Sequence, residues 1–227
     1  TVATTSTGPD GRYSFRGVAS LPTGQEYYVE YYNPDSAPNP GPGYLYLWFG
    51  NRITSYAAGA SVAGGDFDVA DIPLVSPAHG ASVTLPATFS WTPRGLAEDN
   101  YRLVMYYPGA QKRAVTEFLD NVSSVRIGSL LPGWPSGATY HWWVEVYKGS
   151  NPSSTPYNFG VSYWARSVKI NFAAGAAQAA ASGLRHVQPG RYLDRPPSAG
   201  AGPAIGNESS TATLSLGGRG SCRAPGT

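Results

Sequence analysis

Large apolar and polar side chains alternate along short segments of this chain, and glycine or proline interrupts each segment. Residues 138–148 follow the pattern most clearly, because successive side chains of a strand point to opposite faces. One face would carry Tyr140, Trp142, Val144 and Val146, and the other His141, Trp143, Glu145 and Tyr147. The 28 glycines, 20 prolines and 16 tyrosines suit many short strands joined by tight turns better than packed helices. We therefore predict an all-β fold.

A short link marked by Pro77 divides the chain into two parts of sandwich size. Residues 64–91 are predicted to run from the last strand of one module, through Ser76 and Pro77, into the first strands of the next. A chain of 227 residues has room for two modules of about a hundred residues each. We predict two tandem antiparallel β-sandwich modules, residues 1–74 and 75–172, held by this link as a semi-rigid pair.

The first module is predicted to be a series of short strands. Residues 1–17 would form a hairpin with its turn at 9–11, followed by strands at 27–32 and 44–49. Residues 33–43 would form a proline-rich surface loop, Gly50–Asn51 a turn, and residues 66–74 the closing strand.

Residues 10–32, DGRYSFRGVASLPTGQEYYVEYY, resemble the carboxypeptidase regulatory-like, or transthyretin-like, β-sandwich family. The resemblance rests on a DGxYxF strand, a Leu-Pro-x-Gly turn and a YxVxx strand in that order, and it covers about residues 5–74. It implies a prealbumin-like sandwich. Members of the family begin with two further strands, so the resemblance also implies either a shortened module or an open sheet edge that a neighbour covers.

The second module resembles a fibronectin type III-like sandwich of the Ig-like class. The resemblance rests on Trp91 in an early strand, on the Leu-Pro-x-x-x-x-Gly-x-x-Tyr turn that ends at Tyr140, and on the alternating strand that follows. It implies that Tyr140 is a corner tyrosine, whose hydroxyl bonds back to the preceding loop. Beyond it, residues 173–227 are rich in alanine, glycine and proline and are predicted to be a flexible tail, in which alanine propensity would allow a short helix at 173–183.

Catalytic and metal-binding motifs are sparse. The histidines, His79, His141 and His186, have no metal-ligand spacing and form no obvious triad, and GxSxG, HExxH and phosphate-binding glycine loops are missing from the sequence. We predict no enzyme activity and no cofactor. A net charge of +2 without clustered cations argues against a nucleic-acid partner, and no apolar run approaches the roughly 18–20 residues that a membrane-spanning helix needs.

Asp66, Asp68 and Asp71 form the best metal candidate, because three closely spaced carboxylates supply the oxygen ligands that calcium prefers. The competing interpretation is a solvent-facing strand edge, since Asp66 and Asp68 are two residues apart and would point the same way. We favour the second interpretation.

Aromatic side chains are the candidates for ligand binding, because Trp and Tyr rings stack on the apolar faces of sugars. The candidates are Tyr44, Tyr46, Trp48, Trp134, His141, Trp143 and Tyr147. Trp134 is predicted to be exposed in a loop, although it would equally serve to cap the end of the sandwich. Packing in a core or interface is the competing interpretation for every one of these rings.

Taken together, these patterns favour a non-catalytic structural or adhesive module, and the family resemblances imply that it belongs to a bacterial extracellular or cell-surface protein. Its expected partners are other protein domains, or further copies of itself that associate through the open sheet edge. The alternative is a carbohydrate-binding accessory module of a secreted hydrolase, with a polysaccharide as partner.

Overall fold

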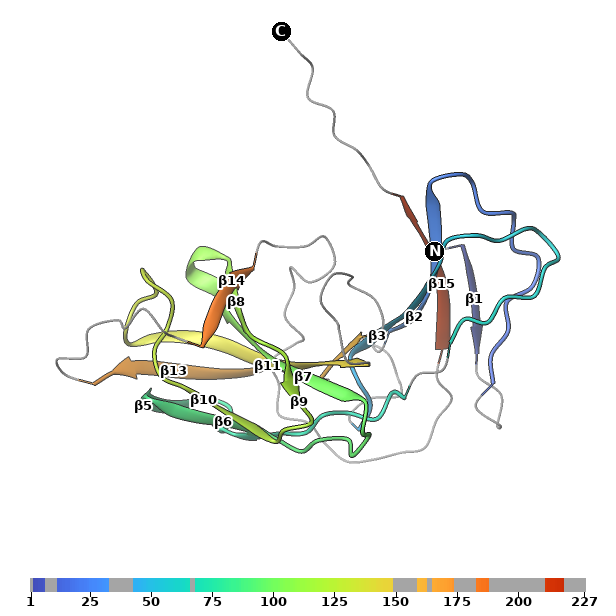
Figure 1. Cartoon of the computed structure of the whole chain (residues 1–227). Coiled ribbons are helices and arrows are strands. Elements are labelled where there is room, and N and C mark those ends of the chain that lie inside the picture. Colours follow the sequence, from blue (N-terminus) through green and yellow to red (C-terminus); the bar gives the residue numbers. More distant parts are fainter. Residues whose placement is uncertain are drawn as a thin grey trace, which may run out of the picture.

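The computed structural model describes residues 2–6, 12–32, 43–65, 68–148, 159–162, 165–173, 183–187 and 211–218. In this part of the chain the regular elements are β-strands and one short 3-10 helix, Pro108–Ala110, which confirms the prediction of an all-β fold. The strands belong to two sheets (Figure 1).

The long sheet follows one path of neighbouring strands. In spatial order they are β1 (Ala3–Ser6), β15 (Thr211–Gly218), β2 (Gln25–Tyr32), β3 (Leu47–Ile53), β12 (Phe159–Val161), β11 (Ala138–Lys148), β7 (Asp99–Tyr107), β8 (Lys112–Thr116) and β14 (Leu184–Val187). Off this path, β13 (Arg166–Phe172) pairs with β11 and β5 (Ala81–Leu85), and β9 (Leu119–Asp120) pairs with β7. The small sheet contains β10 (Ser124–Ile127), β6 (Ala87–Trp91) and β4 (Leu74–Ser76).

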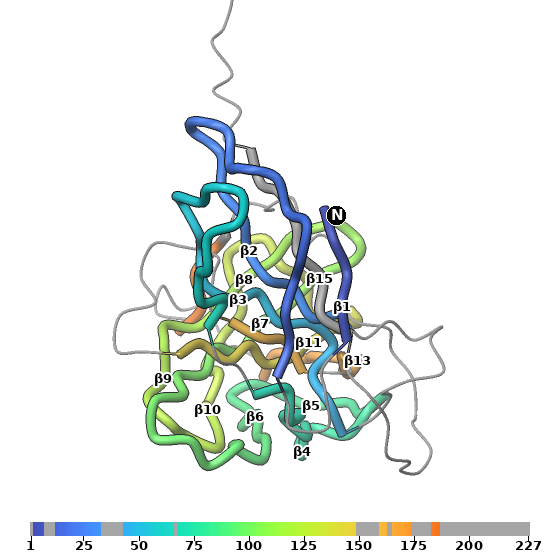
Figure 2. Tube along the Cα trace, turned by 90° about the vertical axis from the view of Figure 1, so that its right-hand side faces the viewer, coloured from blue at the N-terminus to red at the C-terminus, as the bar shows by residue number. Residues whose placement is uncertain are grey.

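The small sheet packs beneath β7, β11 and β13 of the long sheet, as the two views in Figures 1 and 2 agree. The main core fills the space between these layers, where Phe89 of β6 meets Trp142 of β11 edge-on with ring centroids 5.2 Å apart. Val144 and Val146 of β11 face the same core, whereas Trp143 and Tyr147 belong to a second cluster. The predicted alternation along β11 is thus confirmed.

The predicted tie from Tyr140 is also present. Its hydroxyl donates a hydrogen bond to the Pro135 carbonyl oxygen at 2.6 Å, which fixes the loop before β11 against the start of that strand.

The long sheet continues across the predicted module boundary at residue 74. β3 pairs with β12 in the register Phe49↔Phe159, and Trp48 of β3 lies in the same core as Trp142. Leu74, assigned to the first module, begins β4 and pairs with Trp91 of β6. The two predicted parts therefore share one sheet and one core.

Three local predictions for residues 1–74 are wrong. Residues 12–20 form no strand, because Tyr13 and Phe15 pack over the face of β2 in a third apolar cluster. The turn at Gly50–Asn51 lies inside β3, where Gly50 allows close approach to β2: a Cβ there would be 3.2 Å from the Val29 carbonyl oxygen. Residues 68–73 hold only an isolated bridge between Ala70 and Tyr44. Residues 33–42, 66 and 67 lie outside the described residues.

The prediction of a flexible tail is wrong for two segments. β14 pairs with β8 in the register Leu184↔Thr116, and β15 lies between β1 and β2 at one end of the molecule (Figure 1). β15 contains alternating threonine and small or leucine residues with no charge, a composition that suits a strand better than a linker. The segment considered for a helix falls almost wholly outside the described residues.

Candidate functional site

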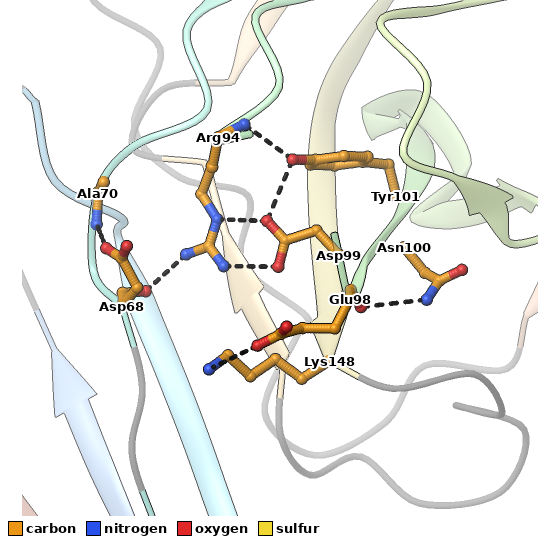
Figure 3. Close-up of polar contacts among 8 residues, drawn as sticks. All are labelled: Asp68, Ala70, Arg94, Glu98, Asp99, Asn100, Tyr101 and Lys148. Atoms are coloured by element: carbon orange, nitrogen blue, oxygen red, sulfur yellow. Dashed lines mark hydrogen bonds and ion pairs between the residues drawn. The ribbon is translucent and has the colours of Figure 1, made fainter. Parts of the chain in front are cut away.

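A group of four residues, here called the junction cluster, lies where the two predicted parts meet (Figure 3). It consists of the buried side chains of Arg94, Asp99 and Tyr101 and of the half-buried Asp68. Arg94 Nε donates to Asp99 Oδ2 at 2.9 Å, and Nη2 donates to Oδ1 at 2.8 Å. The Arg94 and Asp99 side chains are 1% and 0% exposed. A planar guanidinium that meets both carboxylate oxygens has one favoured orientation, so the pair fixes the position of both segments.

Arg94 also contacts residues that precede the Pro77 link. Its Nη1 donates to the Asp68 carbonyl oxygen at 2.6 Å, and its guanidinium carbon lies 5.4 Å from the centre of the Trp48 ring in β3. Asp68 in turn accepts a hydrogen bond from the Ala70 backbone at 2.7 Å, which shapes the local turn. One side chain therefore joins both sides of the link by an ion pair, a hydrogen bond and a cation–π contact.

Tyr101 completes the junction cluster. Its hydroxyl accepts a hydrogen bond from the Arg94 backbone at 2.9 Å and donates one to Asp99 Oδ2 at 3.2 Å. Burial raises the pKa of Tyr101 to about 12, so the hydroxyl remains a neutral donor at physiological pH. In this cluster each ionisable group is held by an opposite charge or a hydrogen bond, an arrangement that stabilises a conformation.

A second arginine binds the link itself. Arg166 of β13 donates from Nη1 to the carbonyl oxygens of Val75 at 2.8 Å and Pro77 at 3.0 Å, and from Nη2 to that of Leu74. Close by, Gly80 donates its backbone N–H to the Ser167 carbonyl oxygen at 2.8 Å. The link is thus anchored to β13 along its length.

A third charged group, which the sequence did not predict, surrounds Glu145 on the outer face of β11. Arg102 Nη2 donates to Glu145 Oε2 at 2.6 Å, Arg113 donates to Oε1, and the Tyr147 hydroxyl donates to Oε2 at 2.9 Å. Burial alone would raise the pKa of Glu145, but Arg113 and Arg102 hold it below its ordinary value. The signal in the sequence is a glutamate between large apolar residues, with Trp143 and Val144 before it and Val146 after it.

Four of the predicted ligand-binding rings are buried. Trp134, expected to be exposed, is 2% exposed because its indole stacks on Tyr140 with centroids 5.3 Å apart, so it caps the sandwich end. Trp48 lies in the main core, and Trp143 and Tyr147 lie in the second cluster, so these rings occupy different cores and form no common platform.

The other three candidates, Tyr44, Tyr46 and His141, are half-buried. Tyr46 lies edge-on to Tyr32, which is 43% exposed, with the two hydroxyl oxygens 3.0 Å apart. Burial, together with His79, lowers the pKa of His141.

The calcium candidate gains no support among the described residues, where no group of three or more metal-ligating side chains gathers. Asp66 lies outside them. Asp68 uses one carboxylate oxygen to cap the Ala70 backbone, and it belongs to a turn instead of the predicted strand.

A cavity of about 670 Å³ lies over the outer face of β2, between residues 12–18 and 53–65. Val18, Tyr27 and Val29 form its floor, and Phe15 and Tyr56 are among its walls. The Tyr13 hydroxyl donates to the Gly65 carbonyl oxygen at 2.7 Å, which joins the two covering segments. An apolar floor, aromatic walls and a volume of this size are typical of small-molecule sites.

Among the strands and turns described, no helix is long and apolar enough to cross a membrane. Comparisons with family models, curated proteins and solved structures returned no match to this chain.

Proposed function

We propose that this chain is a non-catalytic structural or adhesive module of a bacterial extracellular or cell-surface protein. In this proposal residues 1–74, which resemble a carboxypeptidase regulatory-like unit, and residues 75–172, which resemble a fibronectin type III-like unit, act as one rigid spacer because they share a sheet and a core. The observation that carries the proposal is the junction cluster, in which buried Arg94 contacts Asp99 on one side of the link and Asp68 on the other.

A spacer sets the distance and orientation of what lies at its two ends, so the joint between its units must resist bending. Two units on a free linker move relative to one another by default, because interfaces between domains are modest in size. Here Arg166 binds the link and β3 continues the sheet into β12, and both contacts oppose such motion.

Small-angle X-ray scattering on the full chain tests this proposal. The intact protein should scatter as one rigid body, and Arg94→Met should increase the radius of gyration and the flexibility of the joint. Arg126→Met on β10 removes an exposed arginine away from the joint and serves as the matched control. If the scattering of the unaltered chain fitted only two freely moving bodies, the rigid-spacer proposal would be contradicted.

Adhesion is the second half of the proposal and needs its own assay. Beads coated with the full chain should bind to the producing bacteria or to each other more than beads coated with an unrelated β-sandwich. The sheet edges offer the contact surface, because β1 and β14 end the path of the long sheet within the described chain.

A carbohydrate-binding accessory module of a secreted hydrolase is the second candidate, and the aromatic-lined cavity over β2 favours it. Tyr56 and Phe15 are half-buried at this cavity, so they could stack on a sugar ring. A glycan array should then detect binding that Tyr56→Ala abolishes and Tyr32→Ala, a change of an exposed ring elsewhere, preserves. An array with no bound polysaccharide would exclude this candidate.

A further inference from the structure

We propose that β15 exchanges between copies of this chain, so that β15 of one copy completes the long sheet of another. The inference rests on the proposed structural and adhesive role, and it names the segment through which copies associate. Its starting point is the position of β15, which pairs with β2 along Gln25–Tyr31 and with β1 along Ala3–Ser6.

β15 fills a gap that the rest of the sheet cannot close. β1 has no other strand partner within the described residues, and removal of β15 would expose the edge of β2 over most of its length. An exposed edge presents a row of unpaired N–H and C=O groups, which is a template for another strand. In the structure this edge of β2 is covered by β15 of the same chain.

Pairing in a sheet is made by backbone groups, so β15 of a second copy would satisfy the same hydrogen bonds in the same register. Pairing within one chain differs from pairing between two copies only in the segment that connects β15 to the rest of its chain. Residues 188–210 join β14 to β15, and a chain of that length spans at most roughly 80 Å when fully extended. A tether that long leaves room for the strand to reach a neighbouring molecule.

Tethering gives β15 an effective concentration on the order of millimolar at its own β2. In dilute solution the strand therefore pairs within its own chain. When copies are crowded on a surface, the local concentration of β15 from neighbouring molecules competes with the effective concentration of the chain's own β15. Pairing between molecules then becomes favourable. Because the donor strand and the acceptor edges are different surfaces, one copy can donate to a second while it accepts from a third, which builds a chain of molecules.

Paired cysteines test the proposal directly. Thr213 of β15 lies opposite Glu30 of β2, at a distance that a short thiol crosslinker spans. In a Cys222→Ser background, which removes the native cysteine, Glu30→Cys and Thr213→Cys are made separately and together. The two single variants, each with a different tag, are mixed, unfolded and refolded together at rising protein concentration, and then crosslinked.

A crosslinked heterodimer whose fraction rises with protein concentration is the expected result. As control, Arg126→Cys on β10 replaces Glu30→Cys, because that exposed residue lies in the small sheet, away from β2. The proposal is overturned if the heterodimer does not exceed this control while the double variant crosslinks within one chain at every concentration. Failure of the double variant to crosslink at all would also overturn it, and neither result alters the scattering test of the rigid joint.

Discussion

Arg94 and Asp99 form a two-hydrogen-bond ion pair that is almost wholly removed from solvent, with distances of 2.9 and 2.8 Å. Removing one partner from such a pair leaves an uncompensated buried charge, which costs about 3–5 kcal/mol. Asp99→Asn should therefore lower the free energy of unfolding by about this amount in a urea titration. Asp120→Asn, which alters an exposed carboxylate on β9, should change it by less than about 0.5 kcal/mol. Equal effects of the two changes would contradict the role assigned to the pair.

Glu145 should make the free energy of unfolding depend on pH in the acidic range. Its pKa is held below the ordinary value in the folded protein, so the unfolded chain binds the proton more readily. The stabilisation is complete above the unfolded pKa of about 4.3 and is lost as the pH falls through the folded pKa. Thermal melts across pH 2–7 should therefore reveal a decline below about pH 4.3.

Glu145→Gln should flatten that acidic decline and lower stability at neutral pH by about 3–5 kcal/mol, because Arg102 and Arg113 lose their buried counter-charge. Glu117→Gln is the matched control, since the Glu117 side chain is 71% exposed and its ion pair with Arg185 is screened by solvent. An unchanged pH profile in Glu145→Gln would assign the acid sensitivity to other carboxylates.

Tyr140→Phe should cost about 1 kcal/mol, because it removes the hydrogen bond to Pro135 and keeps the ring that stacks on Trp134. Trp134→Ala should cost about 3–5 kcal/mol, since it empties a buried site at the sandwich end. Denaturant titration of both variants measures the difference. A larger loss in Tyr140→Phe than in Trp134→Ala would mean that the hydrogen bond, and not ring packing, holds this end.

Arg166→Lys should loosen the link without unfolding the chain. A lysine ammonium lacks the planar fork with which a guanidinium reaches the carbonyl oxygens of Leu74, Val75 and Pro77 together. Limited proteolysis should cut residues 74–79 faster in this variant than in Arg126→Lys, whose arginine is exposed on β10. Equal cutting rates in the two variants would show that Arg166 does not restrain the link.

Features that follow from local periodicity, such as side-chain direction along a strand, could be predicted from the sequence. Features that depend on distant partners, such as the burial of a loop residue, could not. Alternation along residues 138–148 placed Trp142 and Trp143 on opposite faces correctly, because a strand's pleat fixes side-chain direction. The burial of Trp134 depends on Tyr140 and Tyr107, which contact it only after the loop folds back. Loop position alone therefore suggested exposure.

The strand at residues 211–218 and the role of Arg94 were missed because both depend on contacts between residues far apart in the sequence. Nothing local to residues 211–218 says that they lie beside Gln25–Tyr31, far away in the sequence. The same holds for Arg94, since its importance comes from the approach of Asp68 and Trp48 and not from any motif around it.

The antiparallel pairing of β1 with β15 determines how the protein would respond to mechanical tension. Ala3 lies opposite Leu214 and Ser6 opposite Thr211, so the start of β1 and the end of β15 emerge in the same direction. A force applied at these two points would separate the two strands from that end, so their hydrogen bonds would break one at a time instead of together. Such a force would open β1 and β15 first and leave the joint at Arg94 intact.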